Sequence, residues 1–275
     1  MADLEYTITD GIATILLNRP HRKNAFTLEM LDHWAAALRS ARTDPQVRVV
    51  LVTGADGAFC AGVDLDDFAE ITSTLGRQEV LRDRVHRVAA AALDLDKPLI
   101  AAVDGVAVGA GMDMALACDI RLASTRARFS EAYVRVGLIP GDGGAHLLPR
   151  IVGQARALEL LWTGRFVEAE EARALGLVLS LHDPAELSEA ALALCRRLAD
   201  GRRWRSAPSN ASSATANESI SRLRSRWSPP NRPSSNPPGT PPRRSRRSGR
   251  NAPRVSSVNE PAGPNPGRPN DVWTR

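Results

Sequence analysis

The sequence predicts an α/β domain in residues 1–200, followed by a tail of different composition. Apolar runs of strand length, several of them ending in glycine, alternate with stretches whose apolar residues recur at helical spacing. This alternation is typical of an α/β domain, and no segment repeats at a fixed period. Residues 201–275 hold 13 of the 19 prolines and 14 serines without aliphatic periodicity, which favours disorder.

The first expected elements are two short strands within residues 5–20, which alternate apolar and polar side chains around an Asp10-Gly11 turn. Leu28–Ala41 has the spacing of a helix, 47–54 that of a buried strand, and Val80–Leu95 that of another helix. The later elements are, in order, a strand at 97–105, a glycine-broken turn, a short helix at Met112–Cys118, a strand ending near 123, and helices at Ala145–Ile151, Ala155–Leu161, Glu168–Leu175 and Glu186–Leu198.

The charge divides at the same point as the composition. Residues 201–275 carry 15 Arg, no Lys and 3 acidic residues, a net charge of +12, whereas residues 1–200 carry a net charge of −7. An arginine-rich tail would bind phosphates strongly and with a steep salt dependence. The tail contains no recognisable RNA-binding module, so nucleic-acid binding is kept only as an alternative.

The three cysteines, Cys60, Cys118 and Cys195, are widely spaced and fit neither a disulfide framework nor a zinc site. Each is expected to be a small buried apolar residue. The sequence begins without a signal-like segment and has no apolar run long enough to span a bilayer. We therefore expect a soluble, cytoplasmic protein that binds no metal.

The segment LIPGDGG, residues 138–144, raises a question about its aspartate, Asp142. Aspartate is an ordinary residue of glycine-rich turns, because its side chain can bond to its own backbone. A carboxylate above an apolar pocket would instead have a raised pKa and could carry protons. His146 would lie in the first turn of the following helix, where such a histidine is more often simply partly buried; a hydrogen bond to Asp142 is the alternative.

Several motifs in a fixed order resemble those of one family. They are LNRPHRKNAF, GAFCAGVDL, KPLIAAVDGVAVGAGMDMALACDIRLA, ARFSEAYVRVGLIPGDGGAHLLPRIVG and TGRFVEAEEARALGLV. Together they resemble the crotonase, or enoyl-CoA hydratase/isomerase, superfamily over residues 4–200. The resemblance implies a crotonase-like spiral of ββα units, assembly as homotrimers or hexamers, and an acyl-CoA thioester substrate with no other cofactor.

The resemblance also implies an oxyanion hole made of two backbone N–H groups, those of Val63 and Ala110. Glycines beside them let the backbone turn its N–H groups toward a ligand. Such preorganised donors are worth about 3–4 kcal/mol each at a developing enolate oxygen. On the same basis, the residues expected to bind the substrate are Arg22, Lys23, Ala25, Ala61, Asp64, Leu65, Gly109, Gly111, Leu138 and Pro140.

The sequence departs from a typical family hydratase, which uses two glutamates to activate water and to donate a proton. Asp113 stands at the first of these positions, and Tyr133, a poor base at neutral pH, stands at the second. Glu131, on a strand, would share the face of Tyr133 but lie ~6–7 Å away, so it receives no role. Asp142 falls in a turn where relatives with other chemistry carry a functional acid. We therefore expect Asp142 to move a proton, with Asp113 or Tyr133 as polar partners.

The resemblance ends near Gly201, where the family continues into helices. Permissible codons for residues 201–211 and 243–256, read in one shifted frame, encode segments that resemble the family's C-terminal part. This indicates a frameshift near residues 200–202. Loss of those helices is expected to expose apolar surface on residues 1–200 and to impair assembly.

Three interpretations of function stay open. The first is an acyl-CoA enzyme that adds water to an enoyl-CoA or moves its double bond, and one carboxylate suffices for the second of these reactions. The second is a CoA-thioester hydrolase or a C–C bond enzyme of the same fold. The third is a non-catalytic homologue, with or without a basic tail that binds nucleic acid.

Overall fold

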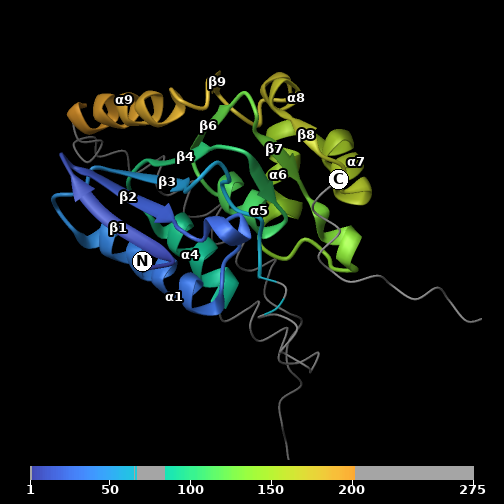
Figure 1. The fold of residues 1–275 in the computed structure, drawn as a ribbon, viewed down its shortest axis with the longest axis horizontal. Coiled ribbons are helices and arrows are strands. Elements are labelled where there is room, and N and C mark those ends of the chain that lie inside the picture. Colours follow the sequence, from blue (N-terminus) through green and yellow to red (C-terminus); the bar gives the residue numbers. More distant parts are fainter. Residues whose placement is uncertain (1, 65, 67–83, 202–275) are drawn as a thin grey trace, which may run out of the picture. The chain divides into compact units, whose positions relative to one another are not determined.

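The computed structural model of the protein describes residues 2–64, 66 and 84–201. Two sheets and the helices around them make up this part of the chain (Figure 1). The expected tail, Leu65 and the first turn of the expected helix at Val80–Leu95 lie outside the described residues. None of the described helices is long and apolar enough to cross a membrane.

The larger sheet has six strands, of which only the first neighbouring pair is antiparallel. In spatial order they are β1 (Leu4–Thr9), β2 (Ile12–Leu17), β3 (Val49–Gly54), β4 (Leu99–Val103), β6 (Ile120–Ser124) and β9 (Ser180–His182). Asp10 and Gly11 join β1 to β2 with φ values of 50° and 78°, which a two-residue hairpin requires. The hairpin expected from the sequence is therefore confirmed.

Helices cover both faces of this sheet (Figure 1). They are α1 (Leu28–Thr43) and α4 (His86–Asp94) on one face, and α9 (Leu187–Asp200) on the other. The strand alternation explains why both faces are apolar: in β3, Val50 and Val52 pack on the side of α1, and Val49 and Leu51 pack on the side of α9. Thr27 caps α1 by accepting the Met30 N–H, which fixes where the helix begins.

A smaller sheet and five further helices build the half that carries the candidate site. The strands are β5 (Val106–Val108), β7 (Arg128–Ser130) and β8 (Val167–Glu168). The helices are α5 (Ala110–Leu116), the 3-10 helix η3 (Ala132–Val136), α6 (Gly144–Val152), α7 (Gln154–Thr163) and α8 (Ala169–Ala174). The four α-helices lie within two residues of their expected ends, whereas the sequence analysis predicted neither the small sheet nor η3. All three cysteines are free and buried, as expected.

Candidate active site

Two backbone segments that the sequence assigned to an oxyanion hole run side by side. An isolated parallel bridge joins Cys60 to Ala107, and the Val108 N–H donates to the Cys60 carbonyl oxygen at 3.0 Å. A Cβ at Gly111 would overlap that carbonyl, so only glycine permits this approach. Gly62 is similarly close, because a Cβ there would lie 2.8 Å from the Val108 carbonyl oxygen.

Val63 and Ala110 hold equivalent places, each three residues after a member of that bridge. Ala110 begins α5, whose first N–H groups have no acceptor within the helix. Gly109 has a φ of 52°, which turns the chain into the helix. A Cβ at Gly62 would lie 3.6 Å from the Ala110 nitrogen, so the two segments meet here.

A phenol and two carboxyl groups meet in the interior beside these segments. Asp113 lies in the first turn of α5, Tyr133 in η3, and Asp142 in the loop before α6. The Tyr133 hydroxyl oxygen is 2.7 Å from Asp113 Oδ2 and 2.8 Å from Asp142 Oδ2. All three side chains are buried, and a Cβ at Gly109 would lie 3.9 Å from the Tyr133 ring. The structure thus brings together the three residues that the sequence singled out.

The two contacts of Tyr133 constrain where protons lie. A phenol has one proton, so it can donate to only one carboxyl group at a time. The other contact is a hydrogen bond only when that carboxyl is protonated and donates to the phenol oxygen. The two distances therefore indicate that Asp113 or Asp142 is neutral in the folded protein.

Glu131 belongs to the same cluster, and the strand geometry expected for it is wrong. β7 ends at Ser130 and Tyr133 lies in a 3-10 helix, so the two residues do not follow one another along a strand. The Glu131 carboxyl group is buried, and its two oxygens lie with Asp113 Oδ1 around the place where Gly144 lacks a side chain. The available signal in the sequence was its place in the motif ARFSEAYVRVG, two residues before Tyr133.

Gly144, the first residue of α6, makes room for these carboxyl groups. A Cβ there would overlap Asp113 Oδ1 and would lie 2.6 Å and 2.9 Å from the two carboxyl oxygens of Glu131. The sequence analysis read Gly143 and Gly144 together as a turn. Only Gly143, with a φ of 119°, needs glycine for its backbone, whereas Gly144 is needed for space.

Burial raises the pKa of every member of the cluster. Burial and the charge of Asp142 raise the pKa of Asp113 to about 7. Burial, with the charge of Asp113, holds the pKa of Glu131 well above its usual range, and it also raises that of Tyr133. The pKa of Asp142 is raised by burial, although its hydrogen bond from Tyr133 and the nearby His86 oppose this. Among the described residues, no group of His, Cys, Asp or Glu has the geometry to hold a metal ion.

Two of the polar residues expected to bind the substrate, Arg22 and Asp64, form ion pairs within the protein. Arg22 forms an exposed ion pair with Asp66, at 2.6 Å. Asp64 is buried and forms an ion pair with Arg19 Nη2 at 2.9 Å, so its carboxylate holds the loop in place. The sequence analysis missed Arg19, which also donates to the Ala25 carbonyl oxygen at 2.6 Å.

Backbone contacts order the remaining expected residues. The Ala61 N–H donates to the Lys23 carbonyl oxygen at 3.0 Å, which ties the RPHRKNA segment to the oxyanion segment. Leu138 and Pro140 are half-buried in the turn before Asp142. Leu65 lies outside the described residues.

Asp142 has His86 rather than His146 as its histidine neighbour. His146 is half-buried, as its ordinary interpretation predicts, and accepts a hydrogen bond at Nδ1 from Arg150 Nη1 at 2.9 Å on α6, so the alternative that pairs it with Asp142 is wrong. His86 of α4 contacts the residue before Asp142, with its Nε2 2.7 Å from the Gly141 carbonyl oxygen. A carbonyl only accepts, so this ring nitrogen carries the proton.

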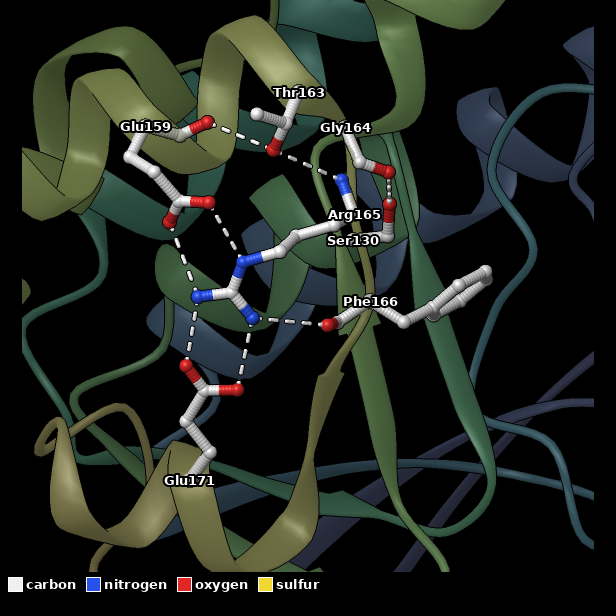
Figure 2. A network of polar contacts seen from close by, with 7 residues as sticks. All are labelled: Ser130, Glu159, Thr163, Gly164, Arg165, Phe166 and Glu171. Atoms are coloured by element: carbon white, nitrogen blue, oxygen red, sulfur yellow. Dashed lines mark hydrogen bonds and ion pairs between the residues drawn. The ribbon is translucent and has the colours of Figure 1, made fainter.

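A surface network ties α7, β8 and α8 to the segment that carries Tyr133 (Figure 2). Arg165 donates to both carboxylate oxygens of Glu159 and to both of Glu171, at distances of 2.7–3.1 Å. Ser130 Oγ donates to the Gly164 carbonyl oxygen at 2.7 Å. A Cβ at Gly164 would lie 3.0 Å from a side chain of η3, so this glycine allows close packing.

Solved structures share this architecture and define it as a crotonase fold. The enoyl-CoA hydratase from Bacillus anthracis superposes with a TM-score of 0.70 at 32% identity, over 73% of this chain and 78% of that one. An enoyl-CoA hydratase from Mycobacterium avium subsp. paratuberculosis K-10 gives a TM-score of 0.67 at 30% identity, over 82% of each chain.

The enoyl-CoA hydratase/isomerase family profile matches residues 7–222, and the chain belongs to that family. It is 39% identical to the 1,2-epoxyphenylacetyl-CoA isomerase of Escherichia coli K12, over 70% of this chain and 74% of the relative. It is 36% identical to the short-chain-enoyl-CoA hydratase of Clostridium acetobutylicum, over 68% of this chain and 71% of the relative.

Proposed function

We propose that this chain moves the double bond of an enoyl-CoA thioester, with Asp142 as the group that removes and returns the proton. The observation that carries this proposal is the state of the Asp142 carboxyl group. Oδ2 is bound by Tyr133, whereas Oδ1 receives no hydrogen bond from the described residues. That buried oxygen has a lone pair to accept a proton from a substrate.

The proposed reaction starts from a 3-enoyl thioester. Asp142 takes a proton from the carbon next to the thioester carbonyl, and the electron pair of the broken C–H bond forms a dienolate. The backbone N–H groups of Val63 and Ala110 are proposed to stabilise the dienolate oxygen. Protonation at the far end of the dienolate then gives the 2-enoyl isomer and restores the Asp142 carboxylate.

Water addition to a 2-enoyl-CoA is the second candidate function. Relatives include hydratases, and Asp113 and Asp142 are two carboxyl groups close together, as hydration requires. However, the Tyr133 hydroxyl already occupies the position between them, within 2.8 Å of both. A water molecule shared by the same inner oxygens would have to displace it, so the geometry favours double-bond migration.

Other parts of the proposal concern binding and domain limits. Residues 1–200 are proposed to form the acyl-CoA-binding domain, with the out-of-frame tail in place of the family's C-terminal helices. The CoA moiety is proposed to lie along Arg22, Lys23 and Ala25 and along Ala61, Asp64 and Leu65. The acyl chain is proposed to pass Leu138 and Pro140.

The test supplies the full-length protein with a 2-enoyl-CoA and a 3-enoyl-CoA in separate reactions and identifies the products by mass and chromatography. Conversion of the 3-enoyl thioester to an isomer of unchanged mass is the expected result. If the 2-enoyl thioester instead gives a product heavier by one water, the function is hydration and the isomerisation proposal is wrong. If neither thioester changes, both candidates fail, and release of free CoA would indicate a thioester hydrolase.

A further inference from the structure

We infer that Glu131 is a positioning residue that holds a proton inside the buried cluster and so leaves Asp142 as its single negative charge. This inference rests on the function proposed above, because it explains why Asp142 is the member that accepts the substrate proton. It follows from the number of protons that the contacts of the cluster require.

The cluster is a chain of four oxygen groups joined by three contacts. Asp142 Oδ2 and Asp113 Oδ2 each contact the Tyr133 hydroxyl, and Asp113 Oδ1 lies beside the two carboxyl oxygens of Glu131. At the last contact, Asp113 Oδ1 and both oxygens of Glu131 gather where Gly144 lacks a side chain. Among the described residues, none of these three oxygens has a hydrogen-bond partner, although the Gly144 backbone N–H lies close enough to lower the pKa of Asp113.

Each contact between two oxygens is a hydrogen bond only if one proton lies between them. Three contacts therefore need three protons, and the Tyr133 phenol supplies one. Two of the three carboxyl groups must supply the others, which leaves one carboxylate. Without these protons, two or three negative charges would be packed together in a buried site, which burial strongly disfavours.

The surroundings decide where the single charge lies. His86 of α4 is the nearby basic group that favours a charge on Asp142, and the N-terminus of α6 begins two residues after Asp142. Glu131, at the other end of this row of four oxygen groups, faces the acidic groups of Asp113 and Asp142. His146 of α6 is engaged by Arg150 instead.

The hydrogen bonds then all point the same way. Glu131 donates to Asp113, Asp113 donates to the Tyr133 oxygen, and Tyr133 donates to Asp142. Hydrogen bonds in such a chain polarise one another, so a donor at one end strengthens the donor at the other. Glu131 thereby lowers the proton affinity of Asp142 without touching the substrate.

The first measurement is the infrared carbonyl band of protonated carboxyl groups in the full-length protein at neutral pH, without substrate. We expect a band from two such groups, shifted in D₂O, and loss of one component in Glu131→Gln. The control Glu168→Gln, which removes an exposed carboxylate, should leave the band unchanged. Absence of the band in the wild type, or an unchanged band in Glu131→Gln, would overturn the inference.

The second measurement is the pH profile of kcat/KM for the reaction of the 3-enoyl-CoA. Gln donates to Asp113 as a protonated Glu does, so Glu131→Gln should stay within about threefold of the wild type and keep its acid limb. Glu131→Leu leaves Asp113 without its donor and should lose about 10- to 100-fold, with the acid limb moved to higher pH. A limb that moves in the Gln variant would contradict the inference.

The two measurements separate this inference from the proposed function. The infrared band does not depend on turnover. A protein with the expected band but no action on either thioester would refute the function and leave the proton on Glu131 established. A merely structural role for Glu131 would lower activity in both variants without moving the acid limb.

Discussion

The buried cluster around Tyr133 and the surface network around Arg165 have the same layout and opposite chemistry. In each, one central side chain contacts two carboxyl groups: Tyr133 lies between Asp113 and Asp142, and Arg165 lies between Glu159 and Glu171 (Figure 2). The surface side chains are 40–44% exposed, whereas the cluster is buried.

The difference lies in the charge of the central group. Arg165 is a permanent cation, and its hydrogen bonds lower the pKa of Glu171. Tyr133 is neutral, and burial raises the pKa of the carboxyl groups beside it. A central cation keeps carboxylates ionised, which suits a structural link, whereas a central phenol lets them keep and exchange protons, which suits acid–base chemistry.

The largest effect is expected from Asp142→Asn, which keeps the shape of the side chain but removes the proton acceptor. We expect turnover of the 3-enoyl-CoA to fall by several orders of magnitude, at or beyond the ~10²–10⁴-fold typical of a lost acid–base group. The matched control is Glu171→Gln, which alters a carboxylate of the surface network and should keep nearly full activity. Near-full activity in Asp142→Asn would remove Asp142 from the mechanism.

The second effect concerns stability against pH. The pKa of Asp113 is about 7 in the folded protein and ~3.9 in an unfolded chain. Between these values the folded state holds a proton that the unfolded state releases, so this group's contribution to stability is present below pH ~4 and is lost as the pH rises through about 7. Asp113→Asn should therefore show a flatter fall in unfolding free energy over that range, measured by denaturant titration.

Asp104 provides a control of opposite sign for the same titration. Its hydrogen bond from Arg126 lowers its pKa, so its contribution is present above the ordinary aspartate pKa and is lost as the pH falls through the lowered value. Asp104→Asn should thus lose more stability at neutral pH than in acid. If Asp113→Asn and Asp104→Asn changed the pH dependence of the unfolding free energy in the same direction, the proposed contrast between a buried carboxyl group and an ion-paired one would be wrong.

The smallest effect is expected from Arg165→Gln. Exposed ion pairs contribute only ~0.2–1 kcal/mol each, and salt screens them. We expect a loss of about 1 kcal/mol in unfolding free energy, smaller at high salt, with no change in turnover. A loss of several kcal/mol, or lost activity, would show that the surface network does more than hold α7 to α8.

The sequence predicted the α/β class, the first hairpin and the long helices because their apolar spacing extends over several residues. It did not predict β5, β7 or β8, which have only two or three residues each and therefore too few positions to show a period. The 3-10 helix η3 was missed for the same reason, and with it the true position of Glu131.

The residues of the candidate site could be predicted where a motif contains them, but not where they are brought together only by the three-dimensional packing. Asp113, Tyr133 and Asp142 were found from the motifs, and the structure adds that one hydroxyl joins them. Two neighbours were not foreseen. Glu131 lies beside Asp113 because of a turn that the sequence did not indicate, and Arg19 forms an ion pair with Asp64, which is far from it in the sequence. The alternative that pairs His146 with Asp142 is wrong because Arg150, one helical turn away, is the partner of His146.

Gly144 sets a limit on how this sequence can vary. Every amino acid other than glycine has a Cβ, and at this position that atom would overlap a carboxyl oxygen of Asp113 and crowd Glu131. We therefore expect no substitution of Gly144 to be tolerated, whereas most substitutions of the neighbouring exposed Ala145 should be. In a library of active variants, an unchanging glycine would thus mark the acid cluster, although it contributes no functional group to it.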